Sequence, residues 1–194
     1  MFRRLLPALV VALVLGGALS AAGPVRAQSA AAGDLAAVAL SASELPGFTQ
    51  AQETTPASGV PGISAMFVRT FVSTDASGGA VIDGLIETDQ ALPAGVIVPL
   101  FGGPAFVQAL AGGGVNVQNF RVLAPLGLGA ADQQVAFDLP DPKDGPTLHF
   151  VADIFVRGRV IALVLDGGLQ QPDPAQLAAI AQAQDAKLSA AGLG

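Results

Sequence analysis

The stretch FVADIFVRGRVIALVLDG, residues Phe150–Gly167, decides the fold that this sequence predicts. It contains two apolar runs separated by Arg-Gly-Arg, and Gly158 supplies the positive φ that a tight turn requires. Along Thr147–Arg157 one set of alternate residues is wholly apolar, whereas along Val160–Leu165 both sets are apolar. Strands that are covered on both faces read this way. We therefore expect a hairpin with the C-terminal helix on one face and another helix or a ligand on the other.

The last 20 or so residues predict that C-terminal helix by several independent signals. Asp173 is a typical N-cap, Pro174 suits the first turn, and Gln176 occupies the capping-box position. Gly192 is placed to end the helix. A stripe at 3.6-residue spacing gives the helix one face to bury. The stripe consists of Leu177, Ile180, Ala181, Gln184 and Leu188.

Other runs with alternating apolar residues predict strands ahead of the hairpin. These runs are Ile63–Val72, Ala80–Glu87, Val115–Leu123 and Gln133–Leu139. Gly84 suggests a bulge in the second of them, residues 51–62 read as a loop, and Pro104–Ala111 reads as a short helix stopped by the glycines at 112–114. The expected fold class is α+β, an antiparallel sheet of five or six strands with a C-terminal helix and a shorter mid-chain helix packed on it.

The N-terminus has the layout of a secretory signal, with a basic start, an apolar run and small residues. Val25-Arg26-Ala27 fits the small-x-small rule, so cleavage is expected after Ala27, with Ser20-Ala21-Ala22 as the competing site. An uncleaved membrane anchor is the alternative, since the apolar run is near the lower limit of about 18 residues for a span. We expect a signal peptide over residues 1–27, a disordered leader over 28–33 and a single α+β domain over 34–194. The expected location is secreted or extracytoplasmic, in the cell envelope.

Composition narrows the classes of function. The absence of cysteine excludes disulfides, thiol catalysis and thiolate metal ligands. Without residues 1–27, which hold three arginines and no acid, the formal charge falls from −6 to −9. A chain this acidic offers no basic patch to nucleic acid, and we expect membrane contact only through an uncleaved signal segment. The hydrophobic content of 52% is enough for one globular domain with its own core.

Several short blocks occur together in a familiar combination. They are LSASELPGFTQ (residues 40–50), FVRTFVS (67–73), PLGLGAADQQVAFDL (125–139), the hairpin and the alanine-rich last helix. In this combination the chain resembles exported alpha-beta domains of high-GC bacteria. These include the extracellular sensor-like domains of mycobacterial serine/threonine kinases and small secreted lipoproteins. The resemblance implies a Mog1/PsbP-like sandwich and carries over no catalytic residue. The chain differs from both groups in lacking their cysteines.

His149 is the one histidine of the chain and the first candidate for acid–base chemistry. A general base needs an orienting acceptor within hydrogen-bond reach. Asp153 shares the strand face of His149 but lies roughly 13 Å along it. Asp166 lies opposite His149 if the hairpin turn consists of Arg157 and Gly158, and another register separates them. We expect a partly exposed strand histidine without a catalytic role.

Two sets of carboxylates are candidates for a calcium site and for a glycosidase site. Their members are Asp138, Asp141 and Asp144 in one loop, and Asp83, Glu87 and Asp89 around one strand. Calcium favours oxygen ligands, but the first group has a spacing of three residues and two stiffening prolines, unlike an EF-hand. The second group can supply paired carboxylates for glycoside cleavage, but nothing fixes their separation and the chain has no Trp or Tyr platform for a sugar.

Two glycine-rich stretches complete the candidates. Gly127-Leu128-Gly129 approaches a dinucleotide-binding fingerprint, but a strand follows it where a helix is required, so we interpret it as a loop. The apolar segment 96–110 lies between glycine clusters. It is either a flap over an apolar pocket or a loosely packed core helix.

These observations predict a non-enzymatic binding module of the cell envelope or the secreted fraction. Its partner is an unknown protein or a small apolar ligand. The alternative is a carrier of a small apolar ligand or lipid in an internal cavity, suggested by the Phe-rich strands and the glycine-flanked segment. No catalytic, cofactor-binding or metal-binding residue is assigned and no cofactor is expected, because no set of polar residues converges on a cleft.

Overall fold

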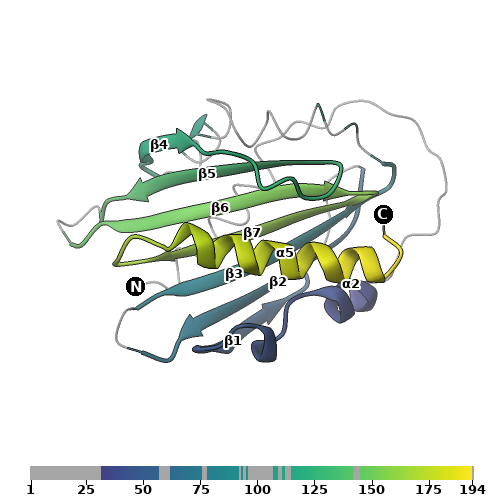
Figure 1. Ribbon diagram of the computed structural model, residues 1–194, viewed down its shortest axis with the longest axis horizontal. Helices are drawn as coiled ribbons and strands as arrows, with labels where there is room; N and C mark the ends of the chain where they lie inside the picture. Colours follow the sequence, from purple (N-terminus) through teal and green to yellow (C-terminus); the bar gives the residue numbers. More distant parts are fainter. Residues whose placement is uncertain are drawn as a thin grey trace.

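The computed structural model describes residues 32–56, 62–75, 78–91, 115–141 and 145–193, together with residues 93, 95, 107, 108 and 111. At its centre is a seven-stranded sheet of order β1-β2-β3-β7-β6-β5-β4, in which all neighbours are antiparallel (Figure 1). The strands are β1 (Phe48–Thr54), β2 (Ile63–Ser73), β3 (Ala80–Thr88), β4 (Gln118–Val122), β5 (Ala131–Leu139), β6 (Leu148–Arg157) and β7 (Val160–Gly168).

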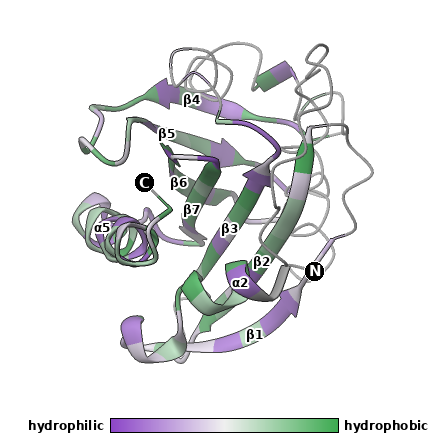
Figure 2. Cartoon of the chain, turned by 90° about the vertical axis from the view of Figure 1, so that its right-hand side faces the viewer, coloured by the Kyte–Doolittle hydropathy of each residue, from purple (hydrophilic) through white to green (hydrophobic). Residues whose placement is uncertain are grey.

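The prediction of five or six strands is wrong, because the sheet also contains the edge strand β1. All its residues except Phe48 are exposed, so it lacks the apolar alternation by which the other strands were found. Its order comes from backbone pairing with β2. Figure 2 shows hydrophilic β1 and β4 at the two edges and mostly hydrophobic strands between them. Polar edges of this kind protect a sheet from pairing with other chains.

The hairpin is confirmed as β6 and β7, near the middle of the sheet. Arg157 pairs with Val160, so the two turn residues are Gly158 and Arg159, and Gly158 has the expected positive φ of 57°. The bulge predicted at Gly84 is wrong, because β3 keeps an unbroken register there with both β2 and β7. A glycine in a strand therefore did not interrupt pairing here.

Three helical elements lie on one face of the sheet: α2 (Ala32–Val38), the 3-10 helix η1 (Ala42–Glu44) and α5 (Pro174–Ala190). Helix α5 begins as predicted, with the Asp173 side chain accepting a hydrogen bond from the Ala175 amide at 2.9 Å. Its buried residues are the five of the predicted stripe. Helix α2 begins at Ala32 and has Asp34 in its first turn.

Two apolar clusters fill the two faces of the sheet. On the helix face, Phe67, Leu85 and Phe155 pack with residues of α2 and α5 such as Leu35, Leu177 and Leu188. On the opposite face the second cluster includes Phe137, Phe150, Ile154, Ile161 and Leu163. Burying one such side chain contributes about 1.5–3 kcal/mol. The prediction that β7 is buried on both faces is therefore confirmed.

Some predictions fall on residues that the structure does not describe. The proposed signal peptide lies within residues 1–31, and the proposed mid-chain helix and flap lie mostly within 92–114. Residues 107, 108 and 111 are helical. Among the described residues, no helix has the length and apolar character needed to cross a membrane.

Candidate functional site

The orienting partner of His149 is Asp138, one of the three carboxylates whose spacing argued against a calcium loop. The two residues face each other across β5 and β6, and His149 Nδ1 lies 2.7 Å from Asp138 Oδ1. The turn consists of Gly158 and Arg159 and not of Arg157 and Gly158, so the alternative that places Asp166 opposite His149 does not occur. On β7, Gly168 is opposite His149 and Asp166 is opposite Val151.

Asn119 fixes the other oxygen of this carboxylate. Its Nδ2 donates to Asp138 Oδ2 at 2.7 Å, and its φ of 50° places a non-glycine residue in the left-handed region, beside the irregular register of β4. Gln171 Nε2 lies 3.2 Å from His149 Nδ1. Partial burial raises the pKa of Asp138, but the hydrogen bonds from Asn119 and His149 and the charge of Arg121 outweigh it and lower the pKa overall. Asp138 is therefore ionised and both its oxygens are bonded.

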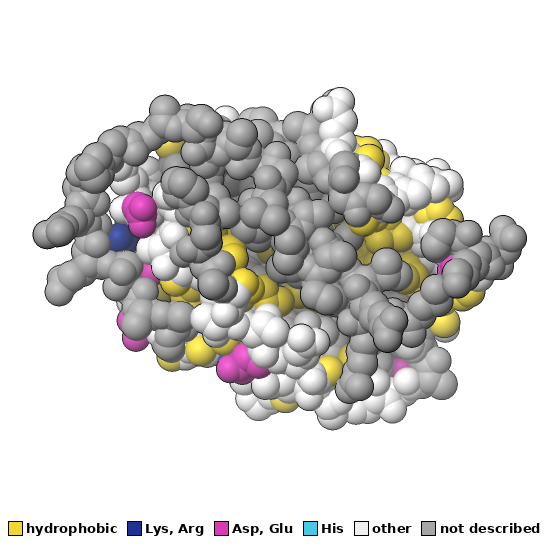
Figure 3. Space-filling model, turned by 180° about the vertical axis from the view of Figure 1, so that it is seen from behind, with side chains coloured by type: hydrophobic (Ala, Val, Ile, Leu, Met, Phe, Trp, Pro, Cys, Tyr) yellow, Lys and Arg dark blue, Asp and Glu magenta, His cyan; other side chains and the backbone are white. Residues whose placement is uncertain are grey.

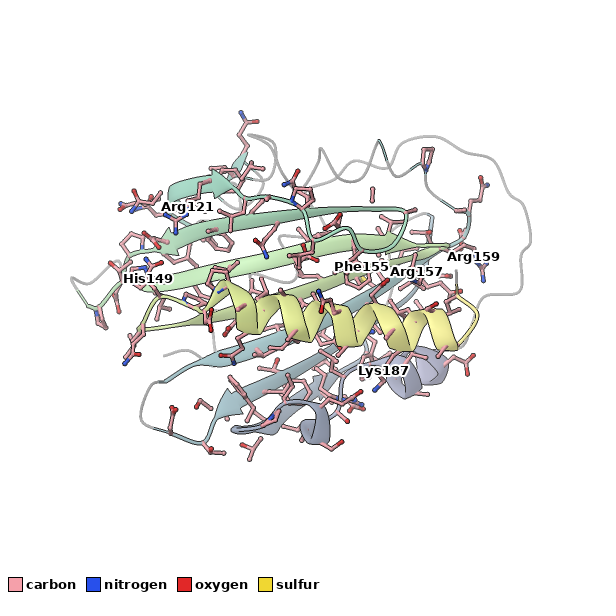
Figure 4. The ribbon with its side chains drawn as sticks, in the orientation of Figure 1. Arg121, His149, Phe155, Arg157, Arg159 and Lys187 are labelled. Atoms are coloured by element: carbon pink, nitrogen blue, oxygen red, sulfur yellow. The ribbon has the colours of Figure 1, made fainter. Side chains whose placement is uncertain are left out.

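Arg121 and His149 lie at the same end of the sheet, whereas Arg157 and Arg159 lie at the opposite end (Figure 4). Of the five lysines and arginines among the described residues, four form ion pairs within the chain: Arg69 with Glu53, Arg157 with Asp185, Arg159 with Glu87 and Lys187 with Glu44. Arg121 is exposed and has no such pair among the described residues. We call the surface formed by Asn119, Arg121, Asp138, His149 and Gln171 the β4-end cluster.

The calcium site suggested by Asp138, Asp141 and Asp144 gains no support. Both oxygens of Asp138 are used by Asn119 and His149, and Asp144 lies outside the described residues. Among the described residues, no group of three His, Cys, Asp or Glu side chains is arranged to hold a metal ion. The predictions that the chain has no metal site and no cofactor remain predictions.

The carboxylates of β3 are bound to partners from other elements. Asp83 Oδ2 accepts the Leu40 amide at 2.7 Å, and Glu87 Oε1 accepts Arg159 Nη2 at 2.8 Å. Both side chains are buried on the helix face, while Asp89 follows the strand at the surface. Their contacts join β3 to the segment after α2 and to the β6–β7 turn. A role of these three residues as a pair of glycosidase carboxylates has no support in this arrangement.

The stretch Gly127-Leu128-Gly129 is a loop, as predicted. It is fastened by Asp132 Oδ2, which accepts the amides of Leu126 and Gly127. A Cβ on Gly129 would lie 2.2 Å from the Val156 carbonyl oxygen, and its φ is 54°. Leu128 is buried in the helix-face cluster, so this loop covers part of that face.

The sequence analysis missed a group of buried carboxyls on the helix face. Asp83 on β3, Asp166 on β7 and Asp153 on β6 are all buried. Burial raises the pKa of Asp83 and Asp153 from 3.8 to about 7 and that of Asp166 to about 6. The available signal was an acidic residue inside each of three strongly apolar strands. We call these three residues the buried carboxyl cluster.

Comparison with known proteins gives one solved structure. No family model and no curated protein matches the chain. The chain is similar to the extracellular domain of PknH from Mycobacterium tuberculosis, with 14% sequence identity and a TM-score of 0.49, over 85% of this chain and 98% of that chain. That neighbour is the extracellular domain of a mycobacterial kinase, and such domains are one of the two groups that the short sequence blocks resemble. A match this distant supports no inference about ligand or activity.

Proposed function

We propose that this chain is an exported, non-enzymatic binding module that recognises a protein partner through the β4-end cluster. The observation that carries the proposal is Arg121, an exposed cation near the Asp138 carboxylate that holds the imidazole of His149 in a fixed orientation. The other four described cations are already used in ion pairs within the chain. An unpaired exposed arginine is the side chain best suited to bind a carboxylate of another molecule, because its guanidinium forms two parallel hydrogen bonds.

The neighbouring surface favours a protein as the partner. Leu169 follows Gly168, the residue opposite His149, and is 46% exposed, one of three large apolar side chains that are exposed among the described residues. An arginine and an exposed apolar side chain at the same end of the sheet form a composition that is enriched in protein interfaces. Asn119 and Gln171 add amide groups to the same surface.

Site-specific crosslinking tests this proposal. A photoreactive residue is placed at Gln118 in one variant and at Gln52 in another. Gln118 is exposed and lies opposite Asp138, whereas Gln52 is exposed on β1 at the opposite edge of the sheet. The variants are expressed in the native host or a close relative, and crosslinked products are identified by mass spectrometry. We expect a discrete adduct from position 118 that Arg121→Glu abolishes. No adduct at 118, the same adducts at 118 and 52, or an adduct at 118 that survives Arg121→Glu contradicts the proposal.

Export is tested separately by sequencing the N-terminus of the protein recovered outside the cytoplasm. The signal layout predicts a mature chain that begins at Gln28, after the Val25-Arg26-Ala27 site. A start at Gly23 would indicate cleavage after Ala22 instead. Recovery of the chain in the cytoplasm with residue 1 or 2 at its start would contradict export and leave the binding proposal to be judged by the crosslinking alone.

A carrier function is the second candidate, favoured by the face of the sheet opposite α5. The helical elements with described packing, α2, η1 and α5, all lie on the other face. Hydrophobic side chains are visible across the middle of this face (Figure 3), which contains the second apolar cluster. Native and denaturing mass spectra of the protein purified without detergent test the idea. A stoichiometric apolar adduct supports the carrier, and a bare polypeptide that rejects added lipids contradicts it.

A further inference from the structure

The buried carboxyl cluster lies in the layer between the sheet and its helices. The register pairs Asp83 with Val164 and Val164 with Asp153, so Asp83 and Asp153 belong to one row across β3, β7 and β6. Asp166 lies two residues along β7 on the same face. All three are at most 6% exposed. A carboxylate removed from water is unfavourable unless hydrogen bonds or opposite charges compensate for the lost hydration.

Asp153 has no such compensation. Both of its carboxyl oxygens are buried without a hydrogen-bond partner among the described residues, and so is Nε2 of Gln134, which is directly opposite on β5. The charged groups that act on Asp153 from the elements packed against it are Asp132 on β5 and Asp185 on α5, and both are acids. Arg157 on its own strand is engaged with Asp185 at 2.7 Å. The protonated form of Asp153 is therefore the one that fits this environment.

Asp166 and Asp83 differ in their surroundings. Asp166 accepts the Gly167 amide and is acted on by Asp173, an acid at the start of α5. Asp83 accepts the Leu40 amide, and the cations Arg69 and Lys187 favour its ionised form, with Glu44 opposing them. Each of these two carboxyls thus has a hydrogen-bond donor, and Asp83 also has cations nearby, whereas Asp153 has no donor among the described residues and the charged groups that act on it are acids. Ionisation of Asp153 is the change that the structure accommodates least.

Helix α5 is the element that can respond to this change. It follows β7, and it contributes nothing to the strand pairing of the sheet. Besides its apolar stripe, it is held by the Arg157–Asp185 ion pair, by Gln184 Nε2 donating to the Val38 carbonyl at 3.0 Å, and by Lys187. It can therefore separate from the sheet and admit water to the carboxyls while all seven strands remain paired.

We propose that α5 is a cover whose docking depends on pH: it stays on the sheet while Asp153 and Asp166 are protonated, and it opens as they ionise. The domain then changes from a closed state in mildly acidic surroundings to an increasingly open state toward neutral and alkaline pH. Opening exposes the apolar stripe of α5 and the sheet residues beneath it. Such a change makes a domain at the cell surface responsive to external pH, independently of what binds at the β4-end cluster.

Thiol labelling tests this cover directly, because the natural chain has no cysteine. Ala181→Cys reports on the buried face of α5, and Ala186→Cys on its exposed face supplies the labelling rate of a free thiol at each pH. Ala152→Cys, buried on the opposite face of β6, reports on unfolding of the whole sheet. Each variant is made in the full chain, alone and together with Asp153→Asn, with Asp89→Asn as the exposed control, and far-UV circular dichroism verifies folding.

The expected result concerns the labelling rate at 181 divided by that at 186. Ionisation of Asp153 alone is to raise the opening constant, and with it this ratio, by about 100-fold between pH 5 and pH 8. In the Asp153→Asn background most of the rise in this ratio should disappear, whereas in the Asp89→Asn background the full rise should remain. The cysteine at position 152 should stay protected from labelling throughout. A flat ratio overturns the proposal, and so does an equal rise with Asp153→Asn. A parallel rise at position 152 shows global unfolding and also overturns it. If Ala181→Cys does not fold, Ile180→Cys replaces it.

Discussion

Asp153→Asn is expected to remove a pH-dependent loss of stability that the wild-type chain carries. Burial together with Asp132 and Asp185 raises the pKa of Asp153 in the folded protein from 3.8 to about 7. Between these two values the folded state binds a proton that the unfolded state releases, so the free energy of unfolding decreases as pH rises. The loss is absent below about pH 4 and complete above about pH 7. Asparagine is neutral throughout, so the variant lacks this contribution at every pH.

The magnitude follows from the shift of the pKa. One unit corresponds to about 1.4 kcal/mol, so the full contribution of Asp153 is about 4 kcal/mol, of which about 3 kcal/mol develops between pH 4.5 and pH 8. The asparagine amide has its own cost in this apolar layer, because it brings two donors that need acceptors. That cost does not depend on pH. The difference between variant and wild type should therefore shift by about 3 kcal/mol in favour of the variant from pH 4.5 to pH 8.

Urea denaturation at a series of pH values measures this difference. The chain has no Trp or Tyr, so far-UV circular dichroism is the suitable signal. Asp89→Asn is the matched control, since Asp89 is exposed and carries the same substitution. A stability difference between Asp153→Asn and wild type that is equal at pH 4.5 and pH 8 would refute the reasoning. A pH-dependent change shared by the Asp89 control would refute it as well.

Three further substitutions test the packing, the loop and the β4-end cluster. Leu188→Ala should destabilise the protein by about 2–5 kcal/mol in urea denaturation, because Leu188 is fully buried on the side of α5 that faces the sheet. Ser189→Ala, on the exposed side of the same helix, should change the stability little. Gly129→Ala should destabilise by more than Gly127→Ala: both glycines have positive φ, but only at 129 does a Cβ meet a carbonyl oxygen. Equal losses would show that φ alone matters. Asp138→Asn should lower the free energy of unfolding by about 1 kcal/mol near pH 7 and leave it unchanged near pH 2. The pKa of Asp138 is lower in the folded protein than its ordinary value near 4, so its ionisation stabilises the fold above that pH, and the stability is lost as pH falls. A loss of stability that does not change with pH would contradict this prediction.

Elements marked by local signals were predictable from the sequence. Helix α5 is specified by its cap, its first-turn proline and its stripe, all within 20 residues, and each of these signals agrees with the others. The β6–β7 hairpin is likewise marked by a glycine between two apolar runs. Strand β1 was missed because its order depends on pairing with β2, 10 or more residues further on, and its own side chains are nearly all in solvent. Edge strands of this kind carry no periodic apolar pattern.

The partner of His149 depended on information that no local pattern contains. The Arg-Gly-Arg sequence allows a turn of Arg157 and Gly158 or of Gly158 and Arg159, and a shift of register by one residue changes the residue opposite His149. Asp138 comes beside His149 only through the pairing of β5 with β6. Asp138 lies near the end of the predicted strand Gln133–Leu139, but it was considered as a ligand only together with the carboxylates of the turn that follows. Its place near a strand end, facing the next strand, was the signal for its contact with His149.

The burial of the carboxyl cluster could not be predicted for a related reason, and this reason also bears on the role of the cluster. Alternation along β6 separates a wholly apolar face from a mixed face that contains Asp153, but it does not say which face the helix covers. Acidic residues within a strand are ordinarily assigned to the solvent side. Here the mixed face is the one beneath α5, so Asp153 and Asp166 are buried where a leucine or valine would be more stable. Two carboxyls that weaken the attachment of the terminal helix, and weaken it most above pH 7, make that helix the part of the domain whose position responds to its surroundings.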